Sequence, residues 1–107
     1  QLSMTRQIEF DPDKEAINWK IHKIHLSTAA LVFGDSQRIE RADDSEGNTT
    51  GEARWQTLGM AGKVLFVVYT ERGENTRIIS ARTANRAEKR SYYGHDNANN
   101  KQWAKAD

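Results

Sequence analysis

The segment Val64–Tyr69, "VLFVVY", constrains the fold more than any other part of this sequence. Its side chains are apolar at every position, and side chains alternate between the two faces of a strand, so both faces are apolar. A strand buried on both faces lies in the interior of a sheet. Turn residues bound the segment, with Ala61-Gly62 before it and Gly73-Glu74-Asn75 after it. We therefore expect a central strand over 63–70 that takes part in two antiparallel hairpins.

The flanking segments provide the remaining strands. Polar and apolar residues alternate over residues 7–10 and 53–60, and a returning strand is expected over 76–82. Residues 36–42 are polar and predict an edge strand, and residues 43–51 have the composition of a loop.

The first helix is predicted from its start signal and its apolar spacing. Asp11 is expected at the N-cap and Pro12 at the first helical position, with the helix ending at about His22. Residues spaced by about one helical turn share a face. The buried stripe of this helix is therefore expected to comprise Ile17, Ile21 and Ile24, with Lys14, Asn18 and His22 away from it.

Two more helices are predicted from capping residues. Ser27 is expected to cap a short helix over Thr28–Phe33 that stops at Gly34. Asn85 and Glu88 have the spacing of a capping box, which starts a helix running to about Tyr93. The order β-α-α-β-β-β-β-α predicts an α+β fold, a twisted and mostly antiparallel sheet with N-terminal helices and a C-terminal helix.

Length limits the chain to a single domain. Its 107 residues suffice for one hydrophobic core. We expect the domain to cover residues 4–93, with Gln1–Ser3 a vector remnant and 94–107 a polar, disordered tail that includes Trp103. The absence of cysteine excludes disulfides and fits the cytoplasm.

Charge is distributed unevenly along the chain. Residues 1–53 carry 6 Lys and Arg against 10 Asp and Glu, whereas residues 54–107 carry 10 against 5. Such asymmetry indicates either an electrostatic binding surface or pairing between an acidic and a basic half. Around the last hairpin lie six cations, which form either a solvated rim or a surface that binds an anion: Arg72, Arg77, Arg82, Arg86, Lys89 and Arg90.

Three segments carry a resemblance to a known family. They are "FDPDKEAINWKIHKI" at Phe10–Ile24, "EGNTTGEARWQTLG" at Glu46–Gly59 and "VVYTERGENTRIISARTANRAEKRSYY" at Val67–Tyr93. Together they resemble the BrnT ribonuclease toxins of bacterial type II toxin–antitoxin modules. That family usually reads N-x-x-K-H-G where this chain has Asn18 to Lys23. His22 is kept, and Lys20 or Lys23 is the candidate for the role of the displaced lysine.

The resemblance implies a RelE-like fold, an endoribonuclease that needs no metal or other cofactor, and a BrnA-type antitoxin that binds both the toxin and DNA. Without a metal, RNA is cleaved through its own 2′-OH, which requires proton transfer and stabilisation of charge on the phosphate. The candidate catalytic residues are His22, Lys20, Arg54, Glu71 and Arg82, and the candidate substrate-binding residues are Arg72, Arg77, Tyr69 and Lys23.

Strand alternation sorts the arginines further. On a regular strand Arg77 and Arg82 point to opposite faces, while Arg54 can join Arg82 across the open sheet. Tyr69 is either a base-stacking residue or a core aromatic, and Trp19 is either exposed or covered by a partner. Two alternatives to the nuclease stay open: a non-catalytic RNA- or protein-binding module, and an interaction subunit whose basic half is covered by an acidic antitoxin helix.

Overall fold

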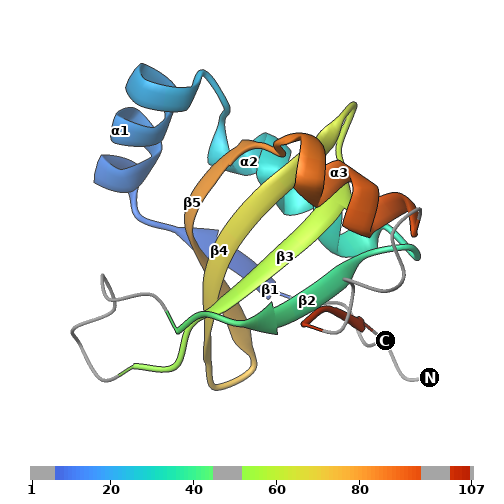
Figure 1. The fold of residues 1–107 in the computed structure, drawn as a ribbon. Coiled ribbons are helices and arrows are strands. Elements are labelled where there is room, and N and C mark those ends of the chain that lie inside the picture. Colours follow the sequence, from blue (N-terminus) through green and yellow to red (C-terminus); the bar gives the residue numbers. More distant parts are fainter. Residues whose placement is uncertain (1–6, 45–51, 95–101, 107) are drawn as a thin grey trace.

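β4 (Val64–Arg72) lies in the interior of a six-stranded sheet and pairs antiparallel with a strand on each side. The computed structural model describes residues 7–44, 52–94 and 102–106 (Figure 1). The strand order is β1-β5-β4-β3-β2-β6. The other elements are β1 (Gln7–Phe10), α1 (Pro12–His22), α2 (Leu26–Ala29), the 3₁₀ helix η1 (Ala30–Gly34), β2 (Ile39–Ala42), β3 (Trp55–Met60), β5 (Asn75–Thr83), α3 (Arg86–Tyr93) and β6 (Ala104–Lys105).

The sheet is mostly antiparallel, which confirms the predicted α+β class and the predicted central strand. Only β1 pairs parallel, along β5. No helix in the described part of the chain is long and apolar enough to cross a membrane.

Helices cover both faces of the sheet (Figure 1). On one face, α2 and η1 bury a core that includes Leu26, Val32 and Val67. Gly59 of β3 lets η1 approach, because a Cβ there would lie 2.7 Å from the Cβ of Val32. On the opposite face, α3 covers one end of the sheet over a second core, with Phe66 among its residues. We call the first the α2 face and the second the α3 face.

Asp35 fixes α3 on the second core. Its Oδ2 accepts hydrogen bonds from the Tyr92 hydroxyl at 2.6 Å and from the backbone N–H of Met60 at 2.8 Å, and Oδ1 accepts one from Gln37 N–H at 2.9 Å. Burial raises the pKa of Asp35, but these hydrogen bonds outweigh it and hold the pKa below its ordinary value. The ionised Asp35 side chain thus connects three parts of the fold: the turn before β2, strand β3 and helix α3.

The first helix has the predicted start, but its predicted apolar stripe is wrong for Ile17 and Ile21, whereas Ile24, just beyond the helix, is buried as predicted. Asp11 accepts a hydrogen bond from Asp13 N–H at 2.7 Å, as an N-cap does. However, the side chains of Ile17 and Ile21 are 57% and 64% exposed, and the buried residue of the helix is Asn18, which is 3% exposed.

The Asn18 side chain explains why α1 turns this face toward the sheet instead of the isoleucine face. Its amide hydrogen-bonds to the backbone at the edge of β5. β1 pairs with β5 only as far as Ile78, so the backbone beyond that residue lacks a strand partner on this side. There the Asn18 amide donates to Ala81 O at 2.8 Å and accepts from Ala81 N–H at 3.0 Å. A second donation, to Ile24 O at 2.8 Å, closes the turn after the helix.

The second helix begins earlier than Ser27. His25 occupies the N-cap position of α2 but makes no side-chain cap. The cap comes from Glu15 on α1, whose Oε1 accepts from Leu26 N–H at 2.6 Å. This hydrogen bond, followed by one with His25, lowers the pKa of Glu15. A side chain distant in sequence supplies the cap, which is why a local pattern misplaces it.

The C-terminal segment adds a strand where a disordered tail is predicted. β6 pairs antiparallel with β2, and Ala106 N–H donates to Arg38 O at 3.0 Å. The tail prediction is therefore wrong for residues 102–106, and β2 is not the outermost strand. The predictions for residues 1–3, 45–51 and 95–101 fall outside the described residues.

Replacing Asn18 by Ala should lower the free energy of unfolding by about 3 kcal/mol, because buried backbone groups of Ala81 and Ile24 lose their partners, each at about 1–3 kcal/mol. Chemical denaturation measures this. Lys20→Ala, on the exposed surface of the same helix, is the control and should stay within about 0.5 kcal/mol of wild type. Equal loss in both variants would contradict the assigned role of Asn18.

Candidate functional site

Beyond the end covered by α3, the α3 face of the sheet bears a row of four side chains, three of which are polar. The strand register aligns Arg41, Gln56, Val68 and Ser80 across β2, β3, β4 and β5. All four are half-buried, so their tips meet solvent. Neighbouring strands lie about 4.8 Å apart, so the row spans about 14 Å from Arg41 to Ser80.

A β-bulge in β5 brings two arginines to this face. Val68 pairs with Ser80 and the next residue of β4, Tyr69, pairs with Ile78, which leaves Ile79 without a partner. Ile78 and Ala81 consequently both face the α2 core. Arg77 and Arg82, predicted on opposite faces, lie on the same one, because a bulge inserts one extra residue and reverses the alternation.

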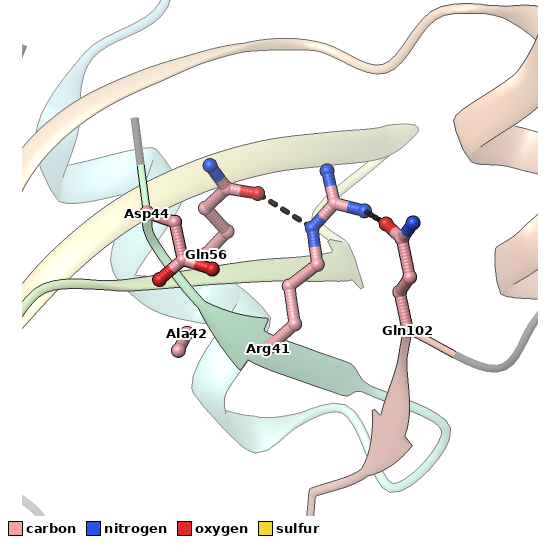
Figure 2. A pocket seen from close by; sticks show the side chains of 5 residues that line it. All are labelled: Arg41, Ala42, Asp44, Gln56 and Gln102. Carbon is pink, nitrogen blue, oxygen red and sulfur yellow. Dashed lines mark hydrogen bonds between the residues drawn. The ribbon is translucent and has the colours of Figure 1, made fainter. Parts of the chain in front are cut away.

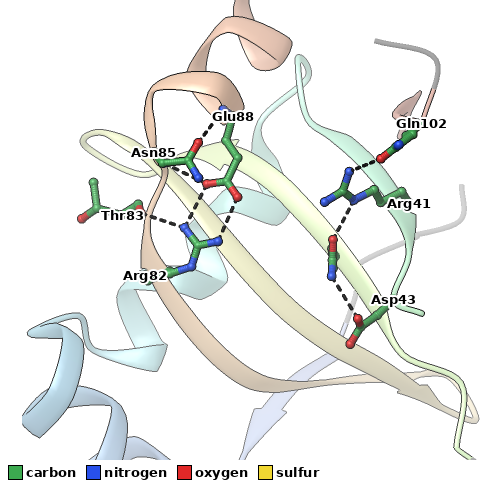
Figure 3. A network of polar contacts seen from close by, with 8 residues as sticks. Arg41, Asp43, Arg82, Thr83, Asn85, Glu88 and Gln102 are labelled. Carbon is green, nitrogen blue, oxygen red and sulfur yellow. Dashed lines mark hydrogen bonds and ion pairs between the residues drawn. The ribbon is translucent and has the colours of Figure 1, made fainter. Parts of the chain in front are cut away.

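Arg82 stands at the α3 end of this face (Figure 3). Its Nη1 and Nη2 donate to the two carboxylate oxygens of Glu88 at 2.9 and 2.8 Å. Its guanidinium lies 4.1 Å from the ring centre of Phe66. Glu88 also closes the predicted capping box with Asn85, so the start of α3 and the orientation of Arg82 depend on the same carboxylate.

Arg41 faces Arg82 across the sheet and was not predicted (Figure 3). Nε donates to Gln56 Oε1 and Nη1 to Gln102 Oε1, each at 2.7 Å. The guanidinium stacks 4.1 Å from the Trp103 ring centre. The one available signal is its spacing, since Ile39 faces the core and Arg41, two residues on, shares its face.

Two surface cavities adjoin Arg41. One, of about 580 Å³, lies beside β2 and β3 and is lined by Arg41, Ala42, Asp44, Gln56 and Gln102 (Figure 2). The other, of about 380 Å³, reaches the start of α3, and Arg41, Gln102, Trp103 and Arg90 are among its lining residues. Arg41 and Gln102 line both.

The remaining arginine candidates lie toward the opposite end of the sheet. Arg77 donates from Nε to Glu9 at 3.0 Å, and Arg72 pairs with Glu52 at 3.2 Å. Arg54 precedes β3, and its buried Nε has no hydrogen-bond partner among the described residues. Strand alternation places Arg54 on the α3 face together with Gln56.

Tyr69 and Glu71 lie on the α2 face, away from these arginines. Tyr69 is 2% exposed and donates its hydroxyl to Glu40 at 2.9 Å. Burial, followed by the charge of Glu40, raises its pKa above the ordinary value. Tyr69 is a core aromatic, the second of its two predicted roles. Glu71, at the hairpin end of β4, accepts from the Thr76 hydroxyl at 2.9 Å.

The candidates on α1 are exposed. His22 lines a cavity of about 240 Å³ with Ile17, Ile21, Ile79 and Ser80. The cavity places His22 beside the bulge, next to the row that contains Arg41. Lys20 is exposed on the same helix, and Lys23 lies beyond its end with φ 60°.

The sequence leaves open whether Trp19 is exposed or covered by a partner. In the isolated chain Trp19 is 42% exposed. One side of its ring stacks on His25 at a centroid distance of 4.2 Å, and Lys23 Nζ lies 5.5 Å from the ring centre.

In the described ranges, no three His, Asp or Glu side chains gather closely enough to hold a metal ion.

Comparison with known proteins places the chain in a family. Residues 10–88 match the family described as the ribonuclease toxin BrnT of type II toxin–antitoxin systems. The crystal structure of the Brucella abortus ribonuclease toxin BrnT superposes with a TM-score of 0.54 at 17% identity, covering 77% of this chain and 100% of that one. At this identity the superposition establishes the fold alone. No curated protein sequence matches the chain.

Proposed function

The chain belongs to the BrnT family of type II ribonuclease toxins, and we propose that it is an endoribonuclease that cleaves RNA without a metal ion on the α3 face of its sheet. The observation that carries this proposal is the collection of arginines on one open face. Arg41, Arg77 and Arg82 share that face through strand register and the β5 bulge, and Arg54 joins them by alternation. Guanidinium groups match phosphate oxygens in shape and charge.

The proposed reaction uses the 2′-OH of the substrate as nucleophile. A base removes its proton, the 2′-oxygen bonds to phosphorus, and the bond from phosphorus to the 5′-oxygen breaks. An acid protonates that 5′-oxygen, which leaves a 2′,3′-cyclic phosphate and a 5′-hydroxyl. Charge that develops on the phosphate is stabilised by donors already in place.

Roles follow from position. From opposite ends of this face, Arg82 and Arg54 bind the phosphate that is cleaved, and His22, beside Ser80, transfers a proton. Lys20 and Lys23 add positive charge on α1, and Arg77 and Arg72 bind flanking phosphates. Tyr69 and Glu71 are left out because the sheet separates them from this face.

Cleavage should continue in EDTA and leave 2′,3′-cyclic phosphate ends, because the 2′-OH needs no metal to attack. An RNA with one 2′-deoxy nucleotide at the cut position should resist, and mass spectrometry of the fragments measures both outcomes. Undiminished cutting of the deoxy substrate would refute the mechanism. Binding of RNA without any cleavage would instead favour the non-catalytic module.

Arg82→Ala and Arg54→Ala should each reduce the cleavage rate by roughly 10²–10³, the usual effect of losing a preorganised donor to the transition state. Initial rates on a labelled RNA, beside thermal unfolding of each variant, separate catalysis from folding. Arg86→Ala is the matched control, because Arg86 is exposed on α3 and lines neither cavity. Near-normal rates for both test variants would assign these arginines to the solvated rim.

We further propose that the antitoxin partner implied by a type II system is a small BrnA-like DNA-binding protein, and that the toxin acts in the cytoplasm. α1 offers the docking surface. Ile17, Trp19 and Ile21 are exposed there, whereas the fold buries Asn18 instead. Lys14, Lys20 and Lys23 surround them, so an amphipathic helix with acidic flanks matches this surface in both polarity and charge. Such a helix would also cover His22.

Ile21→Ala and Trp19→Ala should each weaken the antitoxin complex by about tenfold or more, mainly through faster dissociation, because apolar anchors dominate interface energy. Surface plasmon resonance gives both rates, and association should slow as salt rises. Leu31→Ala is the matched control, since Leu31 is as exposed as Ile21 at 64% but lies on η1. Equal affinity in the Ile21 and Leu31 variants would remove α1 from the interface.

A further inference from the structure

The C-terminal segment 102–106 supplies the contacts that hold Arg41 in place. This segment lies beyond residues 10–88, the region that matches the family. Gln102 and Trp103 are two of the three side chains that contact the Arg41 guanidinium, the third being Gln56. The segment is anchored in turn, because β6 pairs with β2 and Trp103 packs against the second core.

These contacts fix Arg41 without neutralising it. The Trp103 ring lies against the guanidinium, with its centre 4.1 Å away. The two glutamines bind the guanidinium at Nε and Nη1 (Figure 2). All three partners are uncharged. An arginine presents five N–H donors, and two of them are occupied. Nη2 has no partner in the part of the chain that the structure describes.

The surroundings of Arg41 favour an anion. Arg41 lines both cavities on this face, and Arg90 lines the second. Of the carboxylates nearby, Asp43 accepts from Gln56. Glu88 lines the second cavity, but both of its oxygens accept from Arg82, and Asp44 lines the larger cavity. A held, fully charged guanidinium with free donors beside an open cavity is the arrangement that binds phosphate.

We propose that Arg41 binds a phosphate of the single-stranded RNA other than the one cleaved at Arg82, and that Gln102 and Trp103 are positioning residues for this contact. The inference rests on the proposed nuclease function and adds to it a binding position built by the C-terminal segment. Because the contact lies away from the reacting phosphate, it holds substrate and transition state alike and acts on binding rather than on the chemical step.

The test measures binding and turnover separately. The probe is an oligoribonucleotide with a 2′-deoxy nucleotide at the cut position, titrated by fluorescence anisotropy over a salt series. Arg41→Ala should raise Kd about tenfold and reduce the slope of log K against log salt by about 0.7, the value for one phosphate of a single strand. On the cleavable RNA, KM should rise while kcat stays unchanged.

Positioning predicts a particular pattern among the variants. Trp103→Ala should raise Kd about fivefold and Trp103→Phe should restore most of the affinity, because a phenyl ring still stacks on the guanidinium. Gln102→Ala should raise Kd about threefold. Because the Gln102 side chain is exposed, its removal should not disturb folding, so the weaker binding would come from the lost contact with Arg41. The double variant Arg41→Ala/Trp103→Ala should bind no more weakly than Arg41→Ala alone, since Trp103 acts through Arg41.

Arg86→Ala controls for the loss of one charge outside the cavities. If Arg41→Ala keeps the wild-type Kd and salt slope, or matches the Arg86 control, the inference is overturned while the nuclease proposal stands. Additive losses in the double variant overturn the positioning role of Trp103. A wild-type protein that neither binds nor cleaves RNA overturns both proposals.

Discussion

The buried amide of Asn18 determines how the first helix lies on the sheet. Its hydrogen bonds to both backbone groups of Ala81 replace the strand partner that β1 does not provide beyond Ile78. Leaving a buried backbone group without a hydrogen bond lowers the stability of the fold. The helix therefore lies with Asn18 toward the sheet, where its amide supplies the missing bonds. That orientation exposes Ile17 and Ile21 and brings His22 to the bulge. A backbone requirement at the sheet edge thereby creates the exposed apolar surface of α1 and places His22 beside the row that contains Arg41.

The uneven charge along the sequence predicts either a binding surface or pairing between an acidic and a basic half. Pairing describes one part of the molecule. Arg77 pairs with Glu9 and Arg72 with Glu52, so cations of the second half of the chain meet carboxylates of the first. These pairs are partly exposed, and such pairs contribute little to stability. They suppress the positive field at the hairpin without fixing the fold. Elsewhere on the same face, the described partners of Arg41 are neutral, so its charge is not paired in this way.

Local signals in the sequence predicted the parts of this fold that local interactions determine. The apolar run of β4, the Asp11 cap and the Asn85–Glu88 capping box each depend on residues within a few positions of one another. The failures depend on distant partners. The cap of α2 comes from Glu15, and residues 104–105 form a strand by pairing with β2. The bulge at Ile79 leaves no mark in residue type, so strand alternation placed Arg77 and Arg82 on opposite faces. Arg41 was not predicted, because two of its described partners, Gln102 and Trp103, lie in the segment that was expected to be disordered.

The proposed function gives Arg82 and Arg41 different roles, because their partners differ in charge. Arg82 shares its charge with Glu88 through two short hydrogen bonds, so an approaching phosphate meets a partly neutralised group whose direction is fixed. Such a group adds little to ground-state binding, yet it offers its remaining donors where charge increases during reaction. Among the described residues, Arg41 has amide and aromatic partners, which leave its charge unpaired and suit its proposed role in binding the strand. In the proposed function, the carboxylate bonded to Arg82 and the neutral partners described for Arg41 thus divide transition-state stabilisation from substrate binding.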